Sequence, residues 1–193
     1  EQANDWTHSK SIDYVPEDGS FLLSIRHQNW VAKINYADGA GDGAVIWLLG
    51  EDGDFQLVAD DDTWPWFSYQ HDAEMDNGLL SLYDNGNTRV GTLGEGNSRG
   101  QVYLLLESAR LALLVRNVDL GHYAPFLGSA QRYMNGHFMF GSGSMPNDLG
   151  APGRGQSVEV LRSGAVNYRT QVESLMYRSF RIKSFDNPFG DVE

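Results

Sequence analysis

The stretch that decides the fold is "QHDAEMDNGLLSLYDNG", residues 70–86, in which an Asn-Gly pair separates two runs of strand-forming residues. Asn-Gly and Asp-Gly pairs in this setting predict tight hairpins, because both central residues of the turn need positive φ. Two other stretches follow the same plan, "SIDYVPEDGSFLLSIRHQ" (11–28) and "SAQRYMNGHFMFGSGS" (129–144). Their turn glycines, Gly19, Gly78 and Gly136, are 59 and 58 residues apart. The chain therefore contains three repeats, and each is predicted to open with a hairpin.

Two more strands are predicted in every repeat. They are residues 30–36 and 44–50 in the first, 101–107 and 110–119 in the second, and 157–163 and 165–174 in the third. Four antiparallel strands at this period are typical of a β-propeller blade. We therefore predict an all-β fold in which residues 1–193 form a single partial β-propeller domain, with blades at about 8–50, 68–120 and 128–175. A sandwich or barrel is the alternative, because its strand spacing overlaps with this one.

The last apolar run, "YRSFRIKSF" at 177–185, predicts a closing strand that begins a fourth repeat. Propellers usually have about four blades or more. We therefore expect the three blades and the closing strand to belong to a larger ring, with an amino-terminal portion that precedes this sequence.

Composition excludes several classes of function. The 193 residues carry a formal net charge of −12, and no basic run with interleaved aromatic residues offsets it, so nucleic acid is not expected as a partner. No stretch of about 18 apolar residues predicts a membrane span. The chain has no cysteine, which excludes disulfides, thiolate zinc sites and a cysteine nucleophile.

The repeats also predict which polar residues converge. His71 lies seven residues before its turn glycine, Arg26 and Asn85 lie seven after theirs, and His8 lies near the start of the first repeat. An antiparallel hairpin returns its second strand to the level at which the first began, so these four residues are expected to cluster at one mouth of the channel. Two imidazoles and a guanidinium would form an anion site that contains a nucleophile or a general base.

Each of these residues also has an ordinary interpretation. A lone histidine is more often a surface or hydrogen-bonded core residue, and Asn85 is typical of a "DNG" turn. A metal site is a further alternative, but only two of the five histidines occupy equivalent places and Arg26 would repel a cation, so no metal is predicted. Strand alternation would turn His27 to the face opposite Arg26. His122 is expected to be structural or solvated.

Several blocks resemble one known family. "DWTHSKSIDY" (5–14), "SFLLSIRHQNWVAKIN" (20–35), "AVIWLLG" (44–50), "YQHDAEMDNGLLSLYDNG" (69–86) and "YRSFRIKS" (177–184) are similar to blocks of the bacterial aryl-sulfate sulfotransferases, the arylsulfotransferase family of six-bladed propellers. The resemblance implies that this chain is the carboxy-terminal part of such a propeller. It also implies transfer of a sulfuryl group from an aryl sulfate to a phenol without a nucleotide donor, through a transiently sulfated histidine. That histidine is His71 here, and the resemblance implies that His8 and Arg26 bind the sulfuryl group.

One residue departs from the family pattern. Lys10 stands where the motif H-x-N-S has an asparagine, and a lysine binds an anion as a point charge. Lys10, Asn85 and Ser142 are the predicted substrate-binding residues. The resemblance further implies aryl sulfate and phenol as substrates, no metal or organic cofactor, a periplasmic or secreted location, and a homodimer as an assembly that family members can form.

Two other functions compete with sulfuryl transfer. A propeller that has lost catalysis would bind a ligand or a protein, since one fold hosts many functions. A hydrolytic propeller that acts on glycosides would need paired carboxylates facing the channel. Asp72 and Asp84 are available for this, but Asp72 is expected to point away from the channel if His71 points into it.

Overall fold

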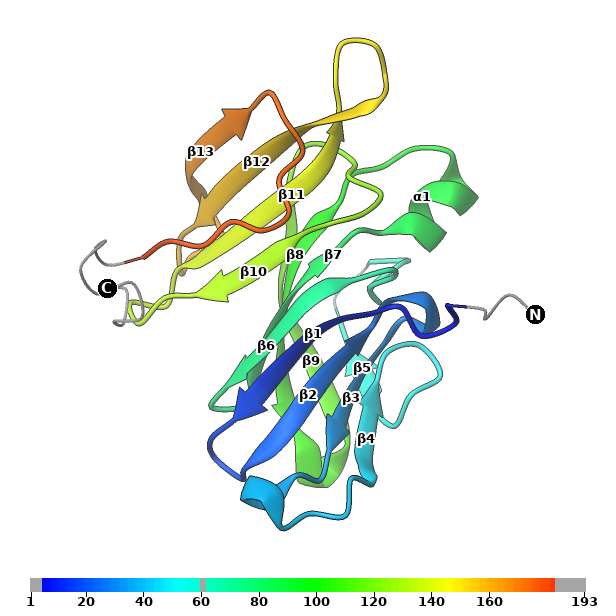
Figure 1. Cartoon of the computed structure of the whole chain (residues 1–193), viewed down its shortest axis with the longest axis vertical. Coiled ribbons are helices and arrows are strands. Elements are labelled where there is room, and N and C mark those ends of the chain that lie inside the picture. Colours follow the sequence, from blue (N-terminus) through cyan, green and yellow to red (C-terminus); the bar gives the residue numbers. More distant parts are fainter. Residues whose placement is uncertain (1–4, 60–61, 183–193) are drawn as a thin grey trace.

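The computed structural model describes residues 5–59 and 62–182, and its secondary structure confirms the all-β prediction. Within these residues the strands form three sheets that follow one another along the chain (Figure 1). The first sheet consists of β1 (Ser9–Val15), β2 (Ser20–Ile25), β3 (Trp30–Ile34) and β4 (Val45–Leu49). The second contains β6 (His71–Asp76), β7 (Leu79–Asp84), β8 (Arg99–Leu106) and β9 (Leu111–Asp119). The third contains β10 (Ser129–Arg132), β11 (Phe138–Pro146), β12 (Pro152–Val160) and β13 (Val166–Val172).

Neighbouring strands in each of these sets of four are antiparallel, as the repeat pattern predicts. Two elements were not predicted. The short strand β5 (Gln56–Val58) pairs in parallel with β9 at the edge of the second sheet, and the helix α1 (Asn87–Leu93) fills the connection between β7 and β8. Three 3₁₀ turns complete the described secondary structure: η1 (Arg26–Gln28), η2 (Ala37–Gly39) and η3 (Glu107–Ala109).

All three predicted hairpins are present, but their turns differ. In the second hairpin Asp76 pairs with Leu79, and the two residues between them, Asn77 and Gly78, both have positive φ, as the sequence predicts. The first hairpin has four residues between its last paired residues, and the third has five. The prediction of a tight two-residue turn is therefore confirmed for the second hairpin and wrong for the other two.

Apolar residues from neighbouring sheets form two hydrophobic clusters. One joins the first and second sheets and includes Leu22, Trp47 and Leu80, and the other joins the second and third sheets and includes Tyr83 and Phe140. A Cβ atom on Gly100 of β8 would overlap the ring of Phe140, so the second and third sheets pack too closely there for a larger residue.

The first strands of the three sheets are neighbours in space. Strand β6 packs beside both β1 and β10 (Figure 1). Side chains link these strands to main-chain amides: Ala73 N donates to Ser11 Oγ at 3.1 Å, and Ala130 N donates to Asp72 Oδ2 at 3.1 Å. His71, the first residue of β6, therefore lies on the middle one of the three first strands.

The predicted closing strand at 177–185 is not found in its described part, residues 177–182, and residues 183–185 lie outside the described residues. Residues 179–181 instead run along β10 and bond to its side chains. Ser179 N donates to Ser129 Oγ at 3.0 Å, and Arg181 N donates to Gln131 Oε1 at 2.8 Å. Because side chains rather than main-chain groups of β10 accept these bonds, no strand ladder forms.

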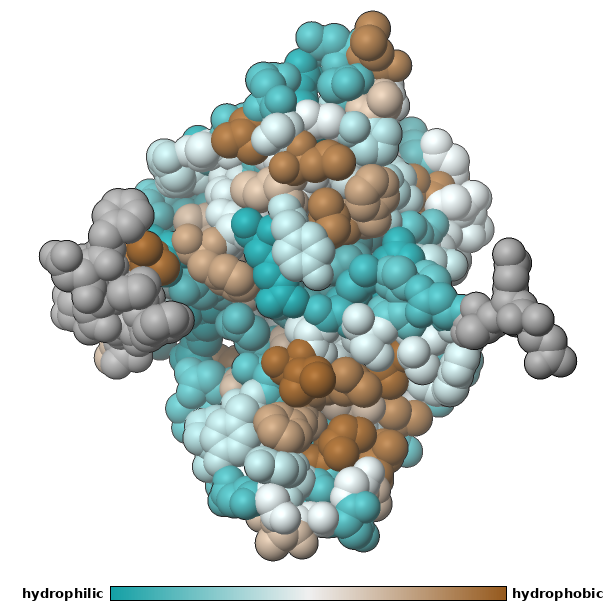
Figure 2. All heavy atoms as spheres, viewed as in Figure 1, coloured by the Kyte–Doolittle hydropathy of each residue, from teal (hydrophilic) through white to brown (hydrophobic). Residues whose placement is uncertain are grey.

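The face of the molecule in Figure 2 has a hydrophilic middle, with hydrophobic side chains above it over the third sheet and below it over the first sheet. Among the described residues, no helix has the length and apolar character that crossing a membrane requires.

Candidate active site

His71 is the first residue of β6 and is followed at once by a β-bulge in the pairing with β7. It pairs with Tyr83 of β7, and the register then slips before Glu74 pairs with Ser81, while Asp72 has a positive φ of 54°. Such a bulge re-aims the side chains around it. The His71 side chain is buried, at 5% exposure, and its Nδ1 lies 2.6 Å from Oδ1 of Asn85.

Asn85 decides which nitrogen of His71 carries the proton. Its Nδ2 donates to the carbonyls of Ala124 at 2.7 Å and Leu127 at 2.9 Å, so its amide can face His71 only with the oxygen. That oxygen accepts, which makes His71 Nδ1 the N–H donor and leaves the lone pair of the neutral ring on Nε2. His71 Nε2 is buried and has no hydrogen-bond partner among the described residues.

The surroundings of His71 keep it uncharged. Burial lowers the pKa of His71 to about 3, and the positive charges of Lys10 and Arg26 act in the same direction against the effect of the Asn85 hydrogen bond. The imidazole is therefore neutral at neutral pH. A neutral imidazole with a free, desolvated lone pair is a competent nucleophile.

Arg26 brings a positive charge close to this nucleophile. It lies in η1, its guanidinium is 4.7 Å from the centre of the Tyr69 ring, and its Nη2 donates to the Pro125 carbonyl at 2.9 Å. Arg26 Nε is buried and has no partner among the described residues. The same loop thus anchors Arg26 through Pro125 and Asn85 through Ala124 and Leu127. Sequence reasoning missed this loop, because main-chain carbonyls leave no signal in residue types.

The structure corrects the predicted orientation of His27. Strand β2 ends at Ile25 and η1 follows, so strand alternation does not apply to Arg26 and His27. The His27 ring stacks on His8 with centroids 4.5 Å apart, and it lies 5.9 Å from the Tyr69 ring beneath Arg26. The region around Arg26 therefore includes His27, which the sequence assigned to the opposite face.

The four residues predicted to cluster are connected to different degrees. His71 and Asn85 are in direct contact, and Arg26 and Lys10 lie within electrostatic reach of His71. Lys10 is half-buried, and burial together with the charge of Arg26 lowers its pKa. The His8 ring is stacked on His27 and is in contact with the carboxylate of Asp5.

Two of the predicted substrate-binding residues are enclosed. Asn85 is fully buried and uses both ends of its amide within the protein, so we assign it to positioning His71, a revision of the predicted substrate contact. Ser142 is also fully buried: its Oγ accepts from the Tyr83 hydroxyl at 2.9 Å and lies 2.9 Å from His122 Nε2. Neither bond leads to His71, and the predicted sulfate contact of Ser142 has no support from these contacts.

Carboxylates gather farther along β1 and β6, beyond Lys10 and His71. Asp13 of β1 and Glu74 of β6 line a cavity of about 590 Å³, and Asp72 is buried nearby. Asp72 lies 3.1 Å from Arg178 and accepts from Ala130, whereas Asp84 is bonded to Ser68 and lies 3.5 Å from Arg89. Each of the two aspartates proposed for a hydrolytic site thus has its own partners, and they do not form a pair.

Glu74 makes stability depend on pH. Burial and the charges of Asp72 and Asp13 raise its pKa to about 8, from an ordinary value of 4.5. The folded protein therefore keeps a proton that the unfolded chain releases, so the free energy of unfolding falls as the pH rises from about 4.5 to 8. We expect Glu74→Gln, which imitates the protonated form, to remove about 2 kcal/mol of this fall. Denaturant unfolding at pH 5 and pH 8.5 checks it.

The control for this measurement is Glu51→Gln, because Glu51 is exposed. It should leave the pH dependence of stability unchanged. Equal pH dependence in the wild-type protein and in Glu74→Gln would contradict the assignment of the proton to Glu74.

Comparison with models of protein families gives a match. A family model described as Arylsulfotransferase (ASST) matches residues 1–181. No curated protein matches the chain. The matched range includes every residue of the site described above, from Asp5 to the loop at 124–127.

Proposed function

Because the chain belongs to the arylsulfotransferase family, we propose that it transfers a sulfuryl group from an aryl sulfate to a phenol through a covalent intermediate on His71. The observation that carries this proposal is His71 Nε2, a buried nitrogen with a lone pair and no partner among the described residues. An unsatisfied buried polar atom costs stability, and such atoms occur where a site must react or bind. Since Nε2 is enclosed, the proposal requires its neighbours to move aside when the donor binds.

The proposed reaction has two steps. In the first, His71 Nε2 attacks sulfur and the aryl oxygen leaves as a phenolate. Phenolate is a fair leaving group because a phenol has a pKa near 10, as tyrosine does. In the second, the acceptor phenol attacks the same sulfur and His71 leaves. Two displacements at one enzyme group give ping-pong kinetics.

The positive groups near His71 have proposed roles in both steps. Arg26 is always charged, and a fixed guanidinium stabilises the oxygens of the sulfuryl group as it passes between nucleophile and leaving oxygen. Lys10 contributes a second positive charge within reach of His71. His8 would donate a proton to the departing phenolate and accept one from the incoming phenol. No step needs a metal or an organic cofactor.

The wider assignment follows from the same family. We propose that the three sheets are consecutive blades of a propeller, at about 8–50, 68–120 and 128–175, within a partial domain that extends over 1–193. Support comes from the antiparallel order of strands in each sheet and from the contact of β6 with β1 and β10. A periplasmic or secreted location and a homodimer are further proposals that rest on the family alone.

The decisive experiment is intact-mass analysis of the full-length protein, quenched rapidly after mixing with 4-nitrophenyl sulfate. We expect an added mass of about 80 Da, the weight of SO₃, on the intact chain, and proteolysis of the quenched protein should place it on the peptide that contains His71. A phenol acceptor added before the quench should remove the adduct and yield the new aryl sulfate. Absence of both an adduct and released nitrophenol would contradict the proposal and favour a propeller that only binds its ligand.

A further inference from the structure

The segment that carries His8 is fastened to the turn that carries Arg26. His27 Nδ1 donates to the Asp5 carbonyl at 2.6 Å, His27 N donates to the Thr7 carbonyl at 3.2 Å, and Gln28 Nε2 donates to the Trp6 carbonyl at 2.8 Å. Three bonds from two residues of η1 thus hold residues 5–7. The "RHQ" block therefore places Arg26 in the site and fixes the "DWTH" block beside it.

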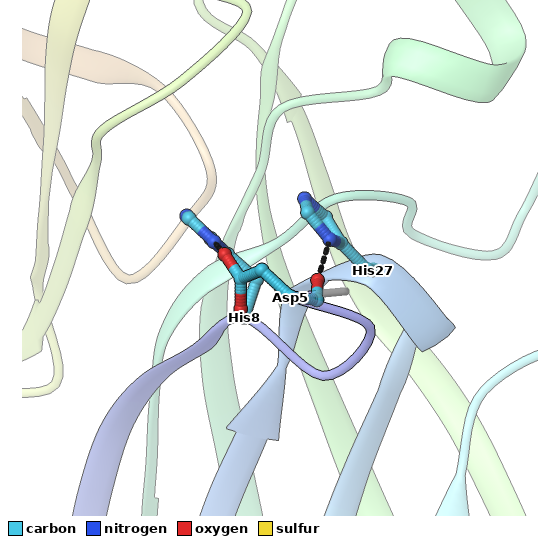
Figure 3. A group of neighbouring side chains, drawn as sticks. All are labelled: Asp5, His8 and His27. Atoms are coloured by element: carbon cyan, nitrogen blue, oxygen red, sulfur yellow. Dashed lines mark hydrogen bonds and ion pairs between the residues drawn. The ribbon is translucent and has the colours of Figure 1, made fainter. Parts of the chain in front are cut away.

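Asp5 is the immediate partner of His8. Its Oδ2 contacts His8 Nδ1, and this hydrogen bond lowers the pKa of Asp5. A carboxylate can only accept, so His8 Nδ1 is the donor and the other ring nitrogen, Nε2, is available for proton transfer. The His8 side chain is 33% exposed, which leaves it accessible from outside, unlike His71. Figure 3 shows Asp5, His8 and His27 gathered next to η1.

The cluster of Asp5, His8 and His27 also contains residue types that bind divalent cations. Ligand atoms of Asp5, His8 and His27 lie within 4.8 Å of one another. However, the two imidazole planes are within 14° of parallel and stacked face to face. The lone pairs of an imidazole lie in its plane, so two stacked rings direct them side by side, whereas tetrahedral coordination needs them to converge on one point. The geometry therefore favours two stacked imidazoles, with the proton on His8 Nδ1 directed at Asp5, over a metal centre.

We propose that Asp5 is a positioning residue for proton transfer by His8, an inference that rests on the proposed function. In the first step the His71 Nε2–sulfur bond forms and the sulfur–oxygen bond of the donor breaks. The electron pair of that bond goes to the phenolate oxygen, which takes the proton from His8 Nε2. In the second step the acceptor phenol gives its proton to His8 Nε2 while its oxygen bonds to sulfur, and the electron pair of the nitrogen–sulfur bond returns to His71.

Other charged groups face this pair. Lys10 and Arg26 are within electrostatic reach of Asp5, and His27 stacks on His8. The carboxylate of Asp5 thus holds the His8 tautomer with the proton on Nδ1, and it places a negative charge beside the ring that donates the proton, opposite two nearby cations. Removal of that charge should slow only those transfers whose leaving group needs protonation.

The test is the rate of adduct formation in one turnover of the full-length protein with two donors. Phenyl sulfate has a strongly basic leaving group that needs a proton, and 4-nitrophenyl sulfate releases a stabilised anion that does not. We expect Asp5→Asn to slow adduct formation from phenyl sulfate at least about tenfold and from 4-nitrophenyl sulfate less than about threefold. Asp5→Glu, which restores the carboxylate, should recover part of the loss. The matched control is Asp42→Asn, because Asp42 is an exposed carboxylate bonded to Asn35 in the connection between β3 and β4.

Three results would overturn the inference in distinguishable ways. Equal slowing with both donors would mean that Asp5 only supports the fold. Loss of adduct formation on chelation, restored by Zn²⁺ in the wild-type protein but not in Asp5→Asn, would identify the cluster as a metal site. Absence of an adduct in the wild-type protein with either donor would instead refute the proposed function.

Discussion

Replacement of His71 by alanine should abolish the 80 Da adduct and reduce sulfuryl transfer by at least about 10³-fold, because the covalent route is lost with its nucleophile. Among the described histidines, only His71 has a buried ring nitrogen without a hydrogen-bond partner; His8 and His27 are less buried and stack on each other. The measurement is the initial rate of nitrophenol release from 4-nitrophenyl sulfate with phenol as acceptor, together with the intact mass after quenching.

A control and a rescue separate chemistry from folding. His137→Ala removes a histidine of the third sheet that is bonded to Glu159, and it should keep full activity. Because His71→Ala leaves a cavity lined by Asn85, added imidazole should restore part of the transfer if the protein is folded. Transfer by His71→Ala at more than one tenth of the wild-type rate, or an adduct on another residue, would show that His71 is not the nucleophile.

Asn85→Leu is expected to have the second largest effect, although Asn85 touches no substrate in our assignment. Leucine has a similar size but cannot accept the Nδ1 proton of His71, so the ring is free to adopt the tautomer that places the proton on the attacking nitrogen. We expect adduct formation to slow about 10²-fold. The carbonyls of Ala124 and Leu127 also lose their donor, which should lower the free energy of unfolding by about 2 kcal/mol. Single-turnover mass analysis and denaturant unfolding measure the two effects.

A substitution at Asn87, the first residue of α1, distinguishes the two roles of Asn85, because Asn87 binds the same loop at 124–127. Asn87 Nδ2 donates to the Pro125 carbonyl at 3.0 Å and has no contact with His71. Asn87→Ala should therefore loosen the loop without changing the His71 tautomer, and its adduct formation should stay within about threefold of the wild-type rate. If a folded Asn85→Leu protein formed the adduct as fast as wild type, the tautomer argument would be wrong.

Much of the fold could be predicted from sequence because it is local. The glycine turns at 19, 78 and 136 and the apolar runs around them predict hairpins and two further strands per repeat, and all of these strands are present. Strand β5 and helix α1 were not predicted, because β5 has only three residues and α1 lies in a polar connection whose apolar residues show only weak helical periodicity. The strand predicted at 177–185 is absent from its described part, 177–182, because residues 179–181 bond to side chains of β10, and no strand pattern reveals such partners.

Contacts within the site could be predicted where the residues belong to one hairpin, but not where they come from different parts of the chain. His71 and Asn85 belong to one hairpin, whose turn brings them together, and their hydrogen bond confirms that expectation. Arg26 and His71 come from two hairpins, and the repeat spacing predicted that they lie near each other but gave no distance between them. Lys10 was identified only from the motif of the family that the chain resembles. The predicted orientation of His27 was wrong because strand β2 ends at Ile25 and a 3₁₀ turn begins at Arg26.

The sequence by itself determined the repeat, the hairpins, the strand pairing within each sheet and the residue types available for chemistry, because turn geometry and side-chain alternation act over a few residues. Only the tertiary structure decided that Asn85 orients His71, that the loop after β9 anchors both Arg26 and Asn85, and that His27 and Gln28 hold Asp5 beside His8. These contacts join residues 14 to 99 positions apart, several through main-chain carbonyls that every residue possesses. Their existence depends on how whole sheets pack against one another, and no local pattern of residue types specifies that packing.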